Sequence, residues 1–293
     1  MERTPSEKIQ TQGKLELSNA CLRKIYHGTR SIPVVKRLYP SLLKMWARLT
    51  WPEGYKVKRY RGVLFLLNYR NQIDRKIGLH GSYESDVCER LFAEMEKGCD
   101  VFLDIGASVG VYALQAAHRG LAKEVHAFDP DPRNFAHLTF NIYLNNLMDV
   151  VRVHPSAVSD TSGPIRFEMA SADKTTNSQV VKTVLDDATT PAMGRMISGS
   201  GTMRQMIAQA LDDILPYKDK KIFFKINIQG HELNALKGAA RLLQENTCFL
   251  QIWLWPENRD RVLLYLADAG YKLVDSNQDS HYSGQGYYYM TKA

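Results

Sequence analysis

The amino-acid sequence predicts an α/β fold with a mostly parallel sheet covered by helices, and three observations lead to this prediction. An apolar run at 101–103 precedes a glycine-containing turn and a helix-like stretch at 111–117. A second strand-like run at 124–128 ends in an acidic residue, Asp129. Strand-like and helix-like segments then alternate toward the end of the chain, which is typical of parallel sheets whose strands are joined by helices.

Each element is predicted from the spacing of its apolar residues. Strands are expected at 62–67, 101–103, 124–128, 150–153, 165–169, 179–183, 222–228 and 249–254, with a closing hairpin at 271–274 and 287–290. Helices are expected at 83–96, 111–117, 132–145, 231–243 and 259–269. In the first helix Val87, Leu91, Phe92 and Met95 form one apolar stripe. The stretch 186–202 is rich in turn residues and long for a loop, and long loops are often lids.

The glycine-containing turn after the strand at 101–103 has the sequence Asp-Ile-Gly-Ala-Ser-Val-Gly at 104–110. A glycine turn between a buried strand and a helix is typical of a nucleotide-cofactor cradle, because glycine lets the backbone approach a ligand that any side chain would push away. A dinucleotide fingerprint would need a glycine at position 108, where this chain has Ser108. The pattern Asp-x-Gly-x-x-x-Gly instead resembles the first motif of S-adenosylmethionine-dependent methyltransferases. The alternative is an ordinary strand-to-helix turn.

A second acidic residue supports a nucleotide site. Asp129 follows the strand at 124–128, roughly 20 residues after the glycines, the separation at which a carboxylate accepts hydrogen bonds from a ribose diol. The alternative places Asp129 in a turn before a helix that Pro132 starts and Asp131 caps. Both interpretations can hold together.

Composition limits the class of protein. A chain of 293 residues can hold one large domain with an added segment, or two small domains. It is 44% hydrophobic and 24% charged, which is ordinary for a globular protein. We find no apolar run of the ~20 residues that span a bilayer, and no signal peptide is expected at the N-terminus. The four cysteines are scattered, so we expect a reduced, cytoplasmic setting and no metal site.

The net charge of +7 is concentrated near the N-terminus. Between residues 20 and 61 there are eleven basic residues and one acidic residue, Glu53. From 34 to 51 the apolar residues recur near helical spacing, with basic residues between them. Such a helix can make peripheral contact with an anionic membrane or face a phosphate-bearing substrate. The alternative is a helix packed on the rest of the protein, with a solvated basic face. Nucleic acid is not indicated as a partner, because no recognition motif accompanies the charge.

The order of motifs resembles the FkbM family of methyltransferases over about residues 62–275. The matching pieces are 71–75, 81–84, 104–110, 127–130, 138–141, 156–160, 211–213 and 225–232. The resemblance implies a class I methyltransferase fold, a Rossmann-like sheet of seven strands whose last strand is antiparallel. It implies a methyltransferase domain at 61–293 behind a basic, partly helical segment at 1–60. It also implies S-adenosylmethionine as methyl donor and, as acceptor, a hydroxyl on a sugar, glycolipid or related natural product.

By the same resemblance Gly106 and Gly110 pass close to the cofactor, and Asp129 binds its ribose. The cofactor-binding set that it implies is Glu84, Asp104, Gly106, Ala107, Ser108, Gly110, Asp129, Pro130, Ser156 and Ala157.

The chain departs from the family in the predicted strand 222–228. The family usually has Lys-x-Asp there, followed by Glu or Gln before a glycine, whereas this chain has Lys225, Asn227 and Gln229. Side chains alternate along a strand, so we expect these three on one face. Asn227 cannot act as a general base because its amide is neutral, but it can orient a substrate hydroxyl or the cofactor's amine. The missing carboxylate also weakens the case for a divalent metal.

Three further residues near this strand complete the catalytic set. Methyl transfer to a hydroxyl needs a base for the proton, and histidine suits this task. His231 is the hypothetical base, with Glu232 acting on it or in its place. The alternatives are a solvent-exposed histidine and, for Glu232, a favourable charge at a helix N-terminus. Lys225 is expected to bind an acidic group, or to pair with Asp104 or Asp213.

Two functions from different classes remain open. One is an active O-methyltransferase on a carbohydrate or glycolipid. The other is a cofactor-binding protein that has lost catalysis and acts as a partner or scaffold, which would agree with Asn227 and Gln229. An NAD-dependent oxidoreductase is disfavoured by Ser108. Residues that could cover a lipid or stack on a sugar, or simply fill the core, are Met193, Met196, Met203, Met206, Trp253 and Trp255.

Overall fold

The computed structural model describes residue 45 and residues 54–170, 178–183, 202–278 and 285–292. These residues fall into two compact units. The larger comprises the described residues of 57–66 and 84–293, and the smaller includes 67–83. Met45 is helical, and the rest of the predicted basic helix at 34–51 lies outside the described residues. None of the helices described is long and apolar enough to cross a membrane.

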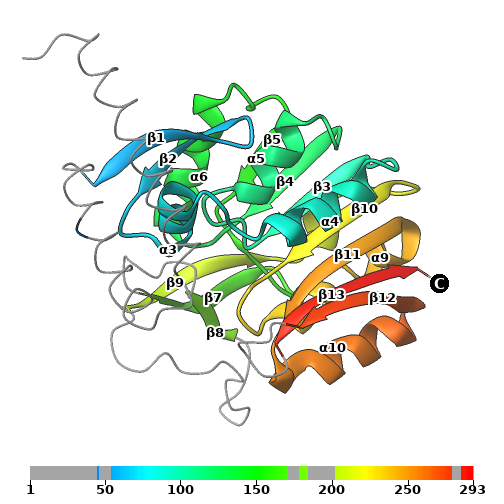
Figure 1. Cartoon of the computed structure of the whole chain (residues 1–293). Helices are drawn as coiled ribbons and strands as arrows, with labels where there is room; N and C mark the ends of the chain where they lie inside the picture. The colour runs from blue at the N-terminus through cyan, green and yellow to red at the C-terminus, as the bar shows by residue number, and fades with distance from the viewer. Residues whose placement is uncertain (1–44, 46–53, 171–177, 184–201, 279–284, 293) are drawn as a thin grey trace, which may run out of the picture. The chain divides into compact units, whose positions relative to one another are not determined.

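The larger unit is built on a seven-stranded sheet with the order β12-β13-β11-β10-β3-β4-β5 (Figure 1). Its strands are β3 Val101–Ile105, β4 Glu124–Phe128, β5 Val151–His154, β10 Lys221–Ile226, β11 Thr247–Leu254, β12 Tyr271–Gln278 and β13 Gly286–Lys292. β13 is antiparallel to both of its neighbours, and the other adjacent strands pair in parallel. The sheet confirms the expected class I arrangement, mostly parallel with an antiparallel last strand.

Helices and two smaller sheets complete the fold. The helices of the larger unit are α4 Ser85–Met95, α5 Val111–His118, α6 Pro132–Leu144, α7 Leu211–Ile214, α8 Glu232–Lys237, α9 Ala240–Glu245 and α10 Pro256–Asp268. A four-stranded sheet has the order β6-β9-β7-β8, with β6 Ala157–Val158, β7 Gly163–Met169, β8 Gln179–Thr183 and β9 Thr202–Gln209. β1 Tyr55–Tyr60 and β2 Val63–Asn68 form a two-stranded sheet. The smaller unit holds α3 Gln72–Arg75 and the π-helical turn η1 Lys76–His80.

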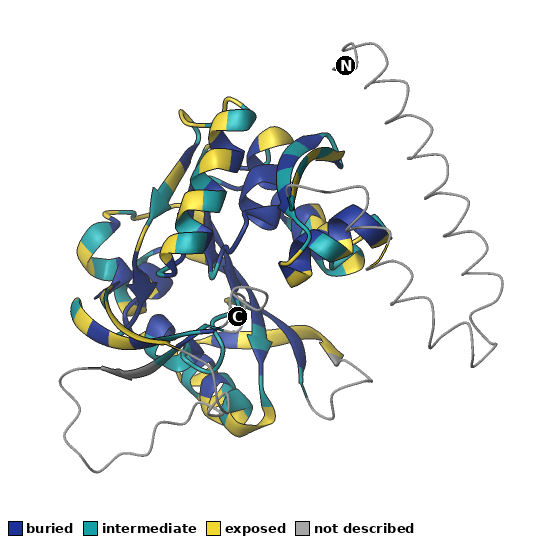
Figure 2. Ribbon diagram, turned by 90° about the vertical axis from the view of Figure 1, so that its left-hand side faces the viewer, coloured by how far each residue is buried: buried dark blue, intermediate teal, exposed yellow. Residues whose placement is uncertain are grey.

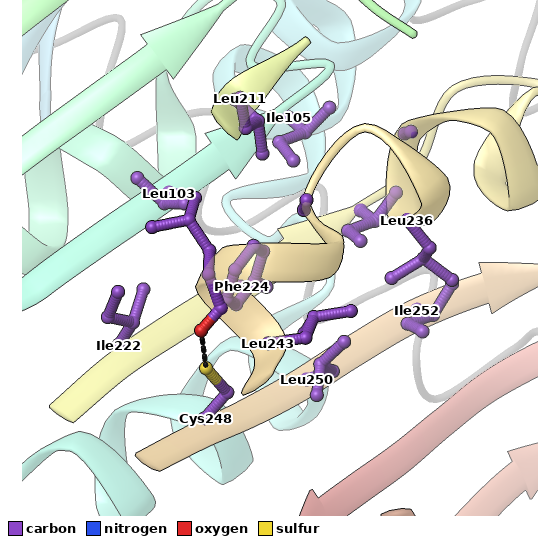
Figure 3. Packing of buried hydrophobic residues seen from close by; sticks show 14 of the residues in the cluster. Leu103, Ile105, Leu211, Ile222, Phe224, Leu236, Leu243, Cys248, Leu250 and Ile252 are labelled. Carbon is purple, nitrogen blue, oxygen red and sulfur yellow. Dashed lines mark hydrogen bonds between the residues drawn. The ribbon is translucent and has the colours of Figure 1, made fainter. Parts of the chain in front are cut away.

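One face of the large sheet is apolar and forms the main core. Leu103 of β3, Phe224 of β10 and Leu250 of β11 are neighbours in the strand registers on this face. Leu236 of α8 and Leu243 of α9 belong to the same buried cluster (Figure 3). The strands of this sheet are mostly dark blue in Figure 2, the colour of buried residues. Burying one such side chain contributes about 1.5–3 kcal/mol, so this face anchors the strands whose ends carry the candidate site.

The opposite face carries a polar row that crosses four strands. Asp104, Lys225, Gln251 and Tyr289 are successive neighbours in the registers of β3, β10, β11 and β13, and all four are buried. A buried polar group costs free energy unless it is paired, so the row depends on partners within the fold. The chain order reverses between β3 and β10, and ligands bind beyond the carboxyl ends of the strands at such a point. Asp104 and Lys225 mark this position.

The predicted strand 222–228 is too long. β10 ends at Ile226, because the following amides of residues 228 and 230 donate to a glutamate side chain and not to a strand. Gln229 has a left-handed φ of 59°. The alternation of side chains predicts Lys225, Asn227 and Gln229 on one strand face. This prediction is wrong for Asn227 and Gln229, which lie beyond the end of the strand.

Two predicted helices also need correction. The helix expected at 231–243 is split into α8 and α9, because Asp212 takes backbone groups that a continuous helix would use: its N–H donates to the Gly238 carbonyl oxygen and its carboxylate accepts from the N–H groups of Arg241 and Leu242. A Cβ at Gly238 would lie 1.9 Å from the Ser159 carbonyl oxygen. In α4 the buried stripe includes Cys88, whereas Val87 is only half-buried. The other three predicted positions, Leu91, Phe92 and Met95, are buried, and the helix begins at residue 85 and not at 83.

β1 and β9 are not predicted from the sequence, because neither has a regular apolar alternation. Most residues of β9 are exposed, and ladder hydrogen bonds to β7 hold it in place. Met203 and Met206 lie on β9, where Met203 is exposed and Met206 packs on a small cluster of buried residues. The expected lid at 186–202 lies outside the described residues up to position 201, as do Met193 and Met196.

Candidate functional site

The glycine turn between β3 and α5 is left-handed at three positions. Gly106 has a φ of 79°, Ser108 of 53° and Gly110 of 89°. A Cβ at position 106 would lie 2.2 Å from the carbonyl oxygen of Asn227, and one at position 110 would lie 2.2 Å from a methyl group of Leu114. Both glycines are therefore required by the backbone conformation and by the packing of the chain on itself.

Lys225 holds this turn to the end of β3. Its Nζ lies 3.0 Å from Asp104 Oδ1, and it donates to the carbonyl oxygens of Gly106 at 2.7 Å and Ile105 at 3.5 Å. The ammonium thus makes an ion pair with Asp104 and hydrogen bonds to two carbonyl oxygens of the turn. Of the two ion pairs expected for Lys225, the one with Asp104 is present, and Asp213 accepts from a serine hydroxyl.

Asp104 connects β3 to the first turn of α5. Its Oδ2 accepts from the N–H of Ala113 at 3.1 Å. This N–H is one of those that the start of a helix leaves without an intrahelical partner. Asp104 is fully buried, and its Oδ2 holds the first turn of α5 while its Oδ1 faces Lys225. Ala107, in the same turn, is also buried.

Glu84 accepts hydrogen bonds from two tyrosine hydroxyls at the start of α4. Tyr112 of α5 and Tyr287 of β13 each donate to its Oε2 at 2.8 Å. Gln251 donates to the Tyr112 hydroxyl at 3.4 Å, and Lys225 Nζ lies 5.3 Å from the centre of the Tyr112 ring. These contacts join Glu84 to the polar row of the sheet.

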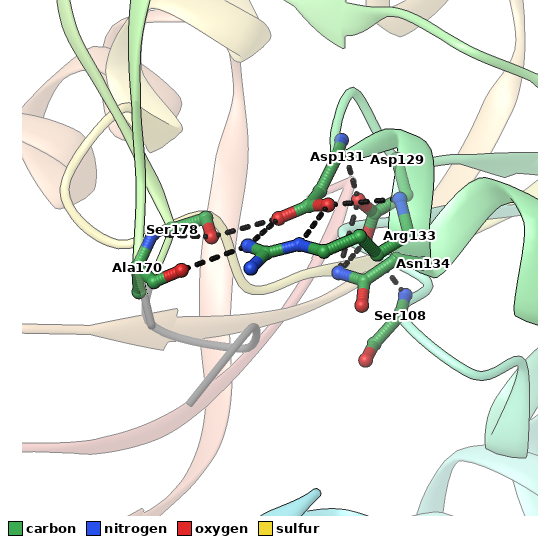
Figure 4. Close-up of polar contacts among 7 residues, drawn as sticks. All are labelled: Ser108, Asp129, Asp131, Arg133, Asn134, Ala170 and Ser178. Carbon is green, nitrogen blue, oxygen red and sulfur yellow. Dashed lines mark hydrogen bonds and ion pairs between the residues drawn. The ribbon is translucent and has the colours of Figure 1, made fainter. Parts of the chain in front are cut away.

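Asp129 follows β4 and is only 6% exposed. Its Oδ2 accepts from the Ser108 N–H at 2.9 Å and its Oδ1 from the Asp131 N–H at 3.0 Å, while Asn134 Nδ2 lies 3.1–3.2 Å from both oxygens (Figure 4). Burial raises the pKa of Asp129 to about 7, although these donors oppose the shift. The ion pairs formed by the described residues do not include Asp129. A buried carboxylate held by neutral donors is suited to accept hydrogen bonds from a ligand.

Asp131 caps α6, as predicted, and is paired with Arg133. Its Oδ1 accepts from the Arg133 N–H at 3.0 Å and from Nε at 2.9 Å, and its Oδ2 from Nη2 at 2.6 Å. Ser178 Oγ donates to Oδ2 at 3.0 Å, and Arg133 Nη2 also donates to the Ala170 carbonyl oxygen at 2.9 Å. Half-buried Pro130 separates this pair from Asp129 in the chain.

Glu232 closes the loop that follows β10. Its Oε1 accepts from the N–H groups of Ile228 and Gly230, each at 3.1 Å, and its Oε2 from Asn258 Nδ2 at 2.5 Å. Asn258 Oδ1 accepts from the Trp255 N–H at 3.1 Å at the start of α10. Glu232 is 1% exposed, and burial raises its pKa. The carboxylate joins the segments that follow β10 and β11.

Asn227 and His231 flank the same loop. Asn227 Oδ1 is buried and has no hydrogen-bond partner within the described ranges. His231 is half-buried, and its Nε2 lies 3.0 Å from Ser159 Oγ, which donates to Asp160 Oδ1 at 2.9 Å. Because the Ser159 hydrogen is directed to Asp160, the hydrogen between Ser159 and His231 belongs to the imidazole Nε2.

Ser156 and Ala157 lie where β6 meets β9. Ser156 Oγ donates to Gln209 Oε1 at 2.7 Å, and Ala157 pairs with Ala208. Both residues are buried. They immediately precede the segment that contacts His231.

A second polar cluster lies on β4 and β5. His126 Nδ1 lies 3.0 Å from His154 Nε2, and His126 Nε2 lies 2.8 Å from the Tyr217 hydroxyl. Tyr217 donates to Glu124 at 2.9 Å. Burial lowers the pKa of each histidine to about 4, so both are neutral at pH 7.

The contact residues that are not predicted from the sequence include Tyr112, Arg133, Asn134, Ser159, Gln251, Asn258 and Tyr287. Arg133 and Asn134 follow the acidic pair in the first turn of a helix, and this position could have indicated their role. The others meet partners from distant parts of the chain, for which no local pattern exists. In the part of the chain that the structure describes, no group of three or more His, Cys, Asp or Glu side chains could hold a metal ion.

Comparison with known proteins identifies related sequences and folds. The family model described as "Methyltransferase FkbM domain" matches residues 104–273. The hexuronic acid methyltransferase AglP of Haloferax volcanii is 26% identical, over 68% of this chain and 75% of its own length.

The crystal structure of methyltransferase FkbM from Methylobacillus flagellatus is 19% identical with a TM-score of 0.44, covering 66% of this chain. This chain spans only 43% of that protein. TYW2 of M. jannaschii, solved in complex with AdoMet, is 14% identical with a TM-score of 0.41, covering 81% of this chain and 84% of its own.

Proposed function

The chain belongs to the FkbM family of methyltransferases, and from this membership we propose that it is an S-adenosylmethionine-dependent O-methyltransferase acting on a hydroxyl of a sugar or glycolipid. The assignment of the cofactor rests on the position of Asp129, a buried carboxylate that accepts a hydrogen bond from the N–H of Ser108 in the glycine turn. The sugar acceptor is supported by AglP, the hexuronic acid methyltransferase similar to this chain.

The residues at the ends of β3, β4 and β10 fit this cofactor. Asp129 would accept the ribose hydroxyls, as carboxylates do at this place in such sheets. Ser108 Oγ and Asn227 Oδ1 are buried without a hydrogen-bond partner among the described residues, so both can serve polar groups of a ligand. When bound, the cofactor supplies an electrophilic methyl group on its sulfonium.

His231 is the proposed base for the acceptor hydroxyl. Its Nε2–H is directed to Ser159, so the basic nitrogen of the neutral ring is Nδ1. Asn227 is proposed to orient the hydroxyl through its side-chain oxygen. Glu232 and Lys225 are assigned supporting roles, because their polar atoms are engaged by the backbone and by buried partners.

Two measurements test the proposal. Isothermal titration calorimetry with S-adenosylhomocysteine should show binding to the wild-type protein and much weaker binding to Asp129→Asn, with the surface variant Asp268→Asn as the matched control. Turnover is then followed by release of S-adenosylhomocysteine from S-adenosylmethionine, with methyl glucuronoside as the acceptor probe.

The product identifies the methylated atom. A methyl ether, expected here, survives mild alkali, whereas a methyl ester is hydrolysed. An alkali-labile product would replace the hydroxyl acceptor by a carboxyl acceptor. Absence of binding by the wild-type protein would contradict the cofactor itself.

A further inference from the structure

Two buried carboxylates lie two residues apart at the end of β4, and they have different partners. Asp129 is held by neutral donors, namely the N–H groups of Ser108 and Asp131 and the amide of Asn134. Asp131 is fully buried and faces the guanidinium of Arg133. Like charges this close disfavour each other's ionised form, so the charge on Asp131 bears on whether Asp129 can accept hydrogen bonds from a ligand.

The guanidinium of Arg133 is held in one orientation by Asp131 and by the Ala170 carbonyl oxygen. Its Nε and Nη2 contact the two oxygens of Asp131 at 2.9 and 2.6 Å, which is the bidentate geometry of a strong, charge-assisted pair. Nη2 also donates to the carbonyl oxygen of Ala170, the residue after β7 (Figure 4). The hydroxyl of Ser178 donates to Asp131 Oδ2, the oxygen that also accepts from Arg133 Nη2, and accepts from the Ala170 N–H. Asp131 is therefore fully engaged by partners other than a ligand.

Two charged side chains at the start of α6 act on Asp129: Asp131, the N-cap, and Arg133. From the glycine turn, the N–H of Ser108 donates to Asp129. On β5, the carbonyl oxygen of His154 accepts from the Asp129 N–H at 3.2 Å, and the imidazole of His154, with its pKa lowered to about 4, is neutral at pH 7. The Asp131 charge opposes ionisation of Asp129, and Arg133 is the cation that compensates for it.

We propose that Arg133 is a positioning residue for cofactor binding: it neutralises Asp131 and links it to the Ala170 carbonyl oxygen, so that the Asp131 charge does not oppose ionisation of Asp129, which accepts the ribose hydroxyls. This inference rests on the proposed function, because it assigns Asp129 to the ribose. It adds that Ala170 and Ser178, on either side of the gap after β7, are hydrogen-bonded to the Asp131–Arg133 ion pair.

Calorimetric titration with S-adenosylhomocysteine between pH 6 and 9 tests this role in five proteins: wild type, Arg133→Gln, Arg133→Lys, Asp131→Asn, and Arg133→Gln combined with Asp131→Asn. The Arg133→Gln substitution leaves Asp131 uncompensated, so the pKa of Asp129 should rise and affinity should fall. One pKa unit corresponds to a factor of ten, and we expect a loss of about threefold to tenfold at pH 7 that disappears toward pH 9.

The double variant separates charge from structure. Asparagine is also a good N-cap, so Asp131→Asn keeps α6 capped while removing the charge. Affinity at pH 7 should return in the double variant to within about twofold of wild type, and Arg133→Lys, which keeps the charge, should follow the wild-type pH profile. Thermal melts of all five proteins show whether each is folded.

A loss that is equal at every pH, or one that the double variant does not recover, would overturn the inference and leave Arg133 with a structural role. In either case the wild-type protein still binds S-adenosylhomocysteine, and the proposed function stands. A wild-type protein that binds none at any pH would overturn the proposed function and the inference together.

Discussion

Lys225 lies directly opposite Asp104 in the register of β10 and β3, with Nζ 3.0 Å from Oδ1 and both side chains buried. Removing one member of a buried ion pair leaves the other charge buried without a partner and lowers the free energy of unfolding by about 3–5 kcal/mol. Removing both members can be nearly neutral. We expect Lys225→Met to lower the free energy of unfolding by an amount in this range, measured by urea denaturation. Combining it with Asp104→Asn should recover most of the loss. Equal destabilisation in the single and double variants would contradict a paired role.

Gly106 and Gly120 offer a matched test of the glycine turn. Both have a left-handed φ, of 79° and 66°, but a Cβ at Gly106 meets the Asn227 carbonyl oxygen at 2.2 Å, while a Cβ at Gly120 meets nothing within 4 Å. Gly120→Ala should cost only the conformational term of about 1–2 kcal/mol. Gly106→Ala should cost a further ~1–3 kcal/mol from the clash and weaken binding of S-adenosylhomocysteine. Similar unfolding free energies for the two variants would show that the turn yields to the added methyl group.

The hydrogen bond between Glu232 and Asn258 can be tested by exchanging the carboxylate and the amide between the two positions. In Glu232→Gln the new amide can retain its oxygen toward the N–H groups of Ile228 and Gly230, but its NH₂ then faces the NH₂ of Asn258. We expect faster hydrogen exchange at both backbone amides and a reduced turnover number. Adding Asn258→Asp restores a donor–acceptor pair and an acceptor for the Trp255 N–H, so protection and turnover should recover together. Recovery of protection without recovery of turnover would indicate that Glu232 acts on the substrate directly.

His231 should control turnover more than binding. Loss of a general base typically lowers the rate by about 10²–10⁴, so His231→Gln should reduce turnover in this range while the affinity for S-adenosylhomocysteine is kept. Ser159→Ala removes the group that orients the imidazole, and the acid limb of the pH–rate profile should shift. A His231→Gln enzyme with unchanged turnover would remove this residue from the list of bases.

The neutral pair of His126 and His154 predicts a loss of stability in acid. Each pKa is lowered from 6.5 to about 4 in the folded protein, so between these values the unfolded chain binds more protons. Their contribution to stability is complete above pH 6.5 and is lost as the pH falls toward 4. Asp129 and Glu232, whose pKa values are raised by burial, act in the opposite direction. The comparison of wild type with His126→Gln isolates the histidine contribution: urea denaturation from pH 7 to 4 should show a shallower decline in the variant.

Several features of the fold follow from signals that act within a few residues. The glycine turn at 104–110, the capping of α6 by Asp131 and the alternation of strands with helices are all predicted correctly. A left-handed turn, a helix cap and an apolar stripe each depend on neighbours along the chain. All seven strands of the large sheet are therefore predicted in the right order, with shifts at their ends. The elements that the sequence does not predict are β1, β6, β9, α3, η1 and α7.

The partners of the polar residues depend on how distant segments meet. Glu84 and Tyr287 are 203 positions apart, and Glu232 and Asn258 are 26 apart, so neither hydrogen bond leaves a trace in local sequence. The end of β10 has a local cause, since the side chain of Glu232 accepts from the N–H groups of Ile228 and Gly230, but strand alternation does not reveal such a contact. Residue types and spacing indicate where a nucleotide can bind. The pairing of Asp131 with Arg133 is local, since the two residues are two positions apart. The burial of Asp129 and its contact with the Ser108 N–H, which leave that carboxylate available to a ligand, arise only when the strands come together.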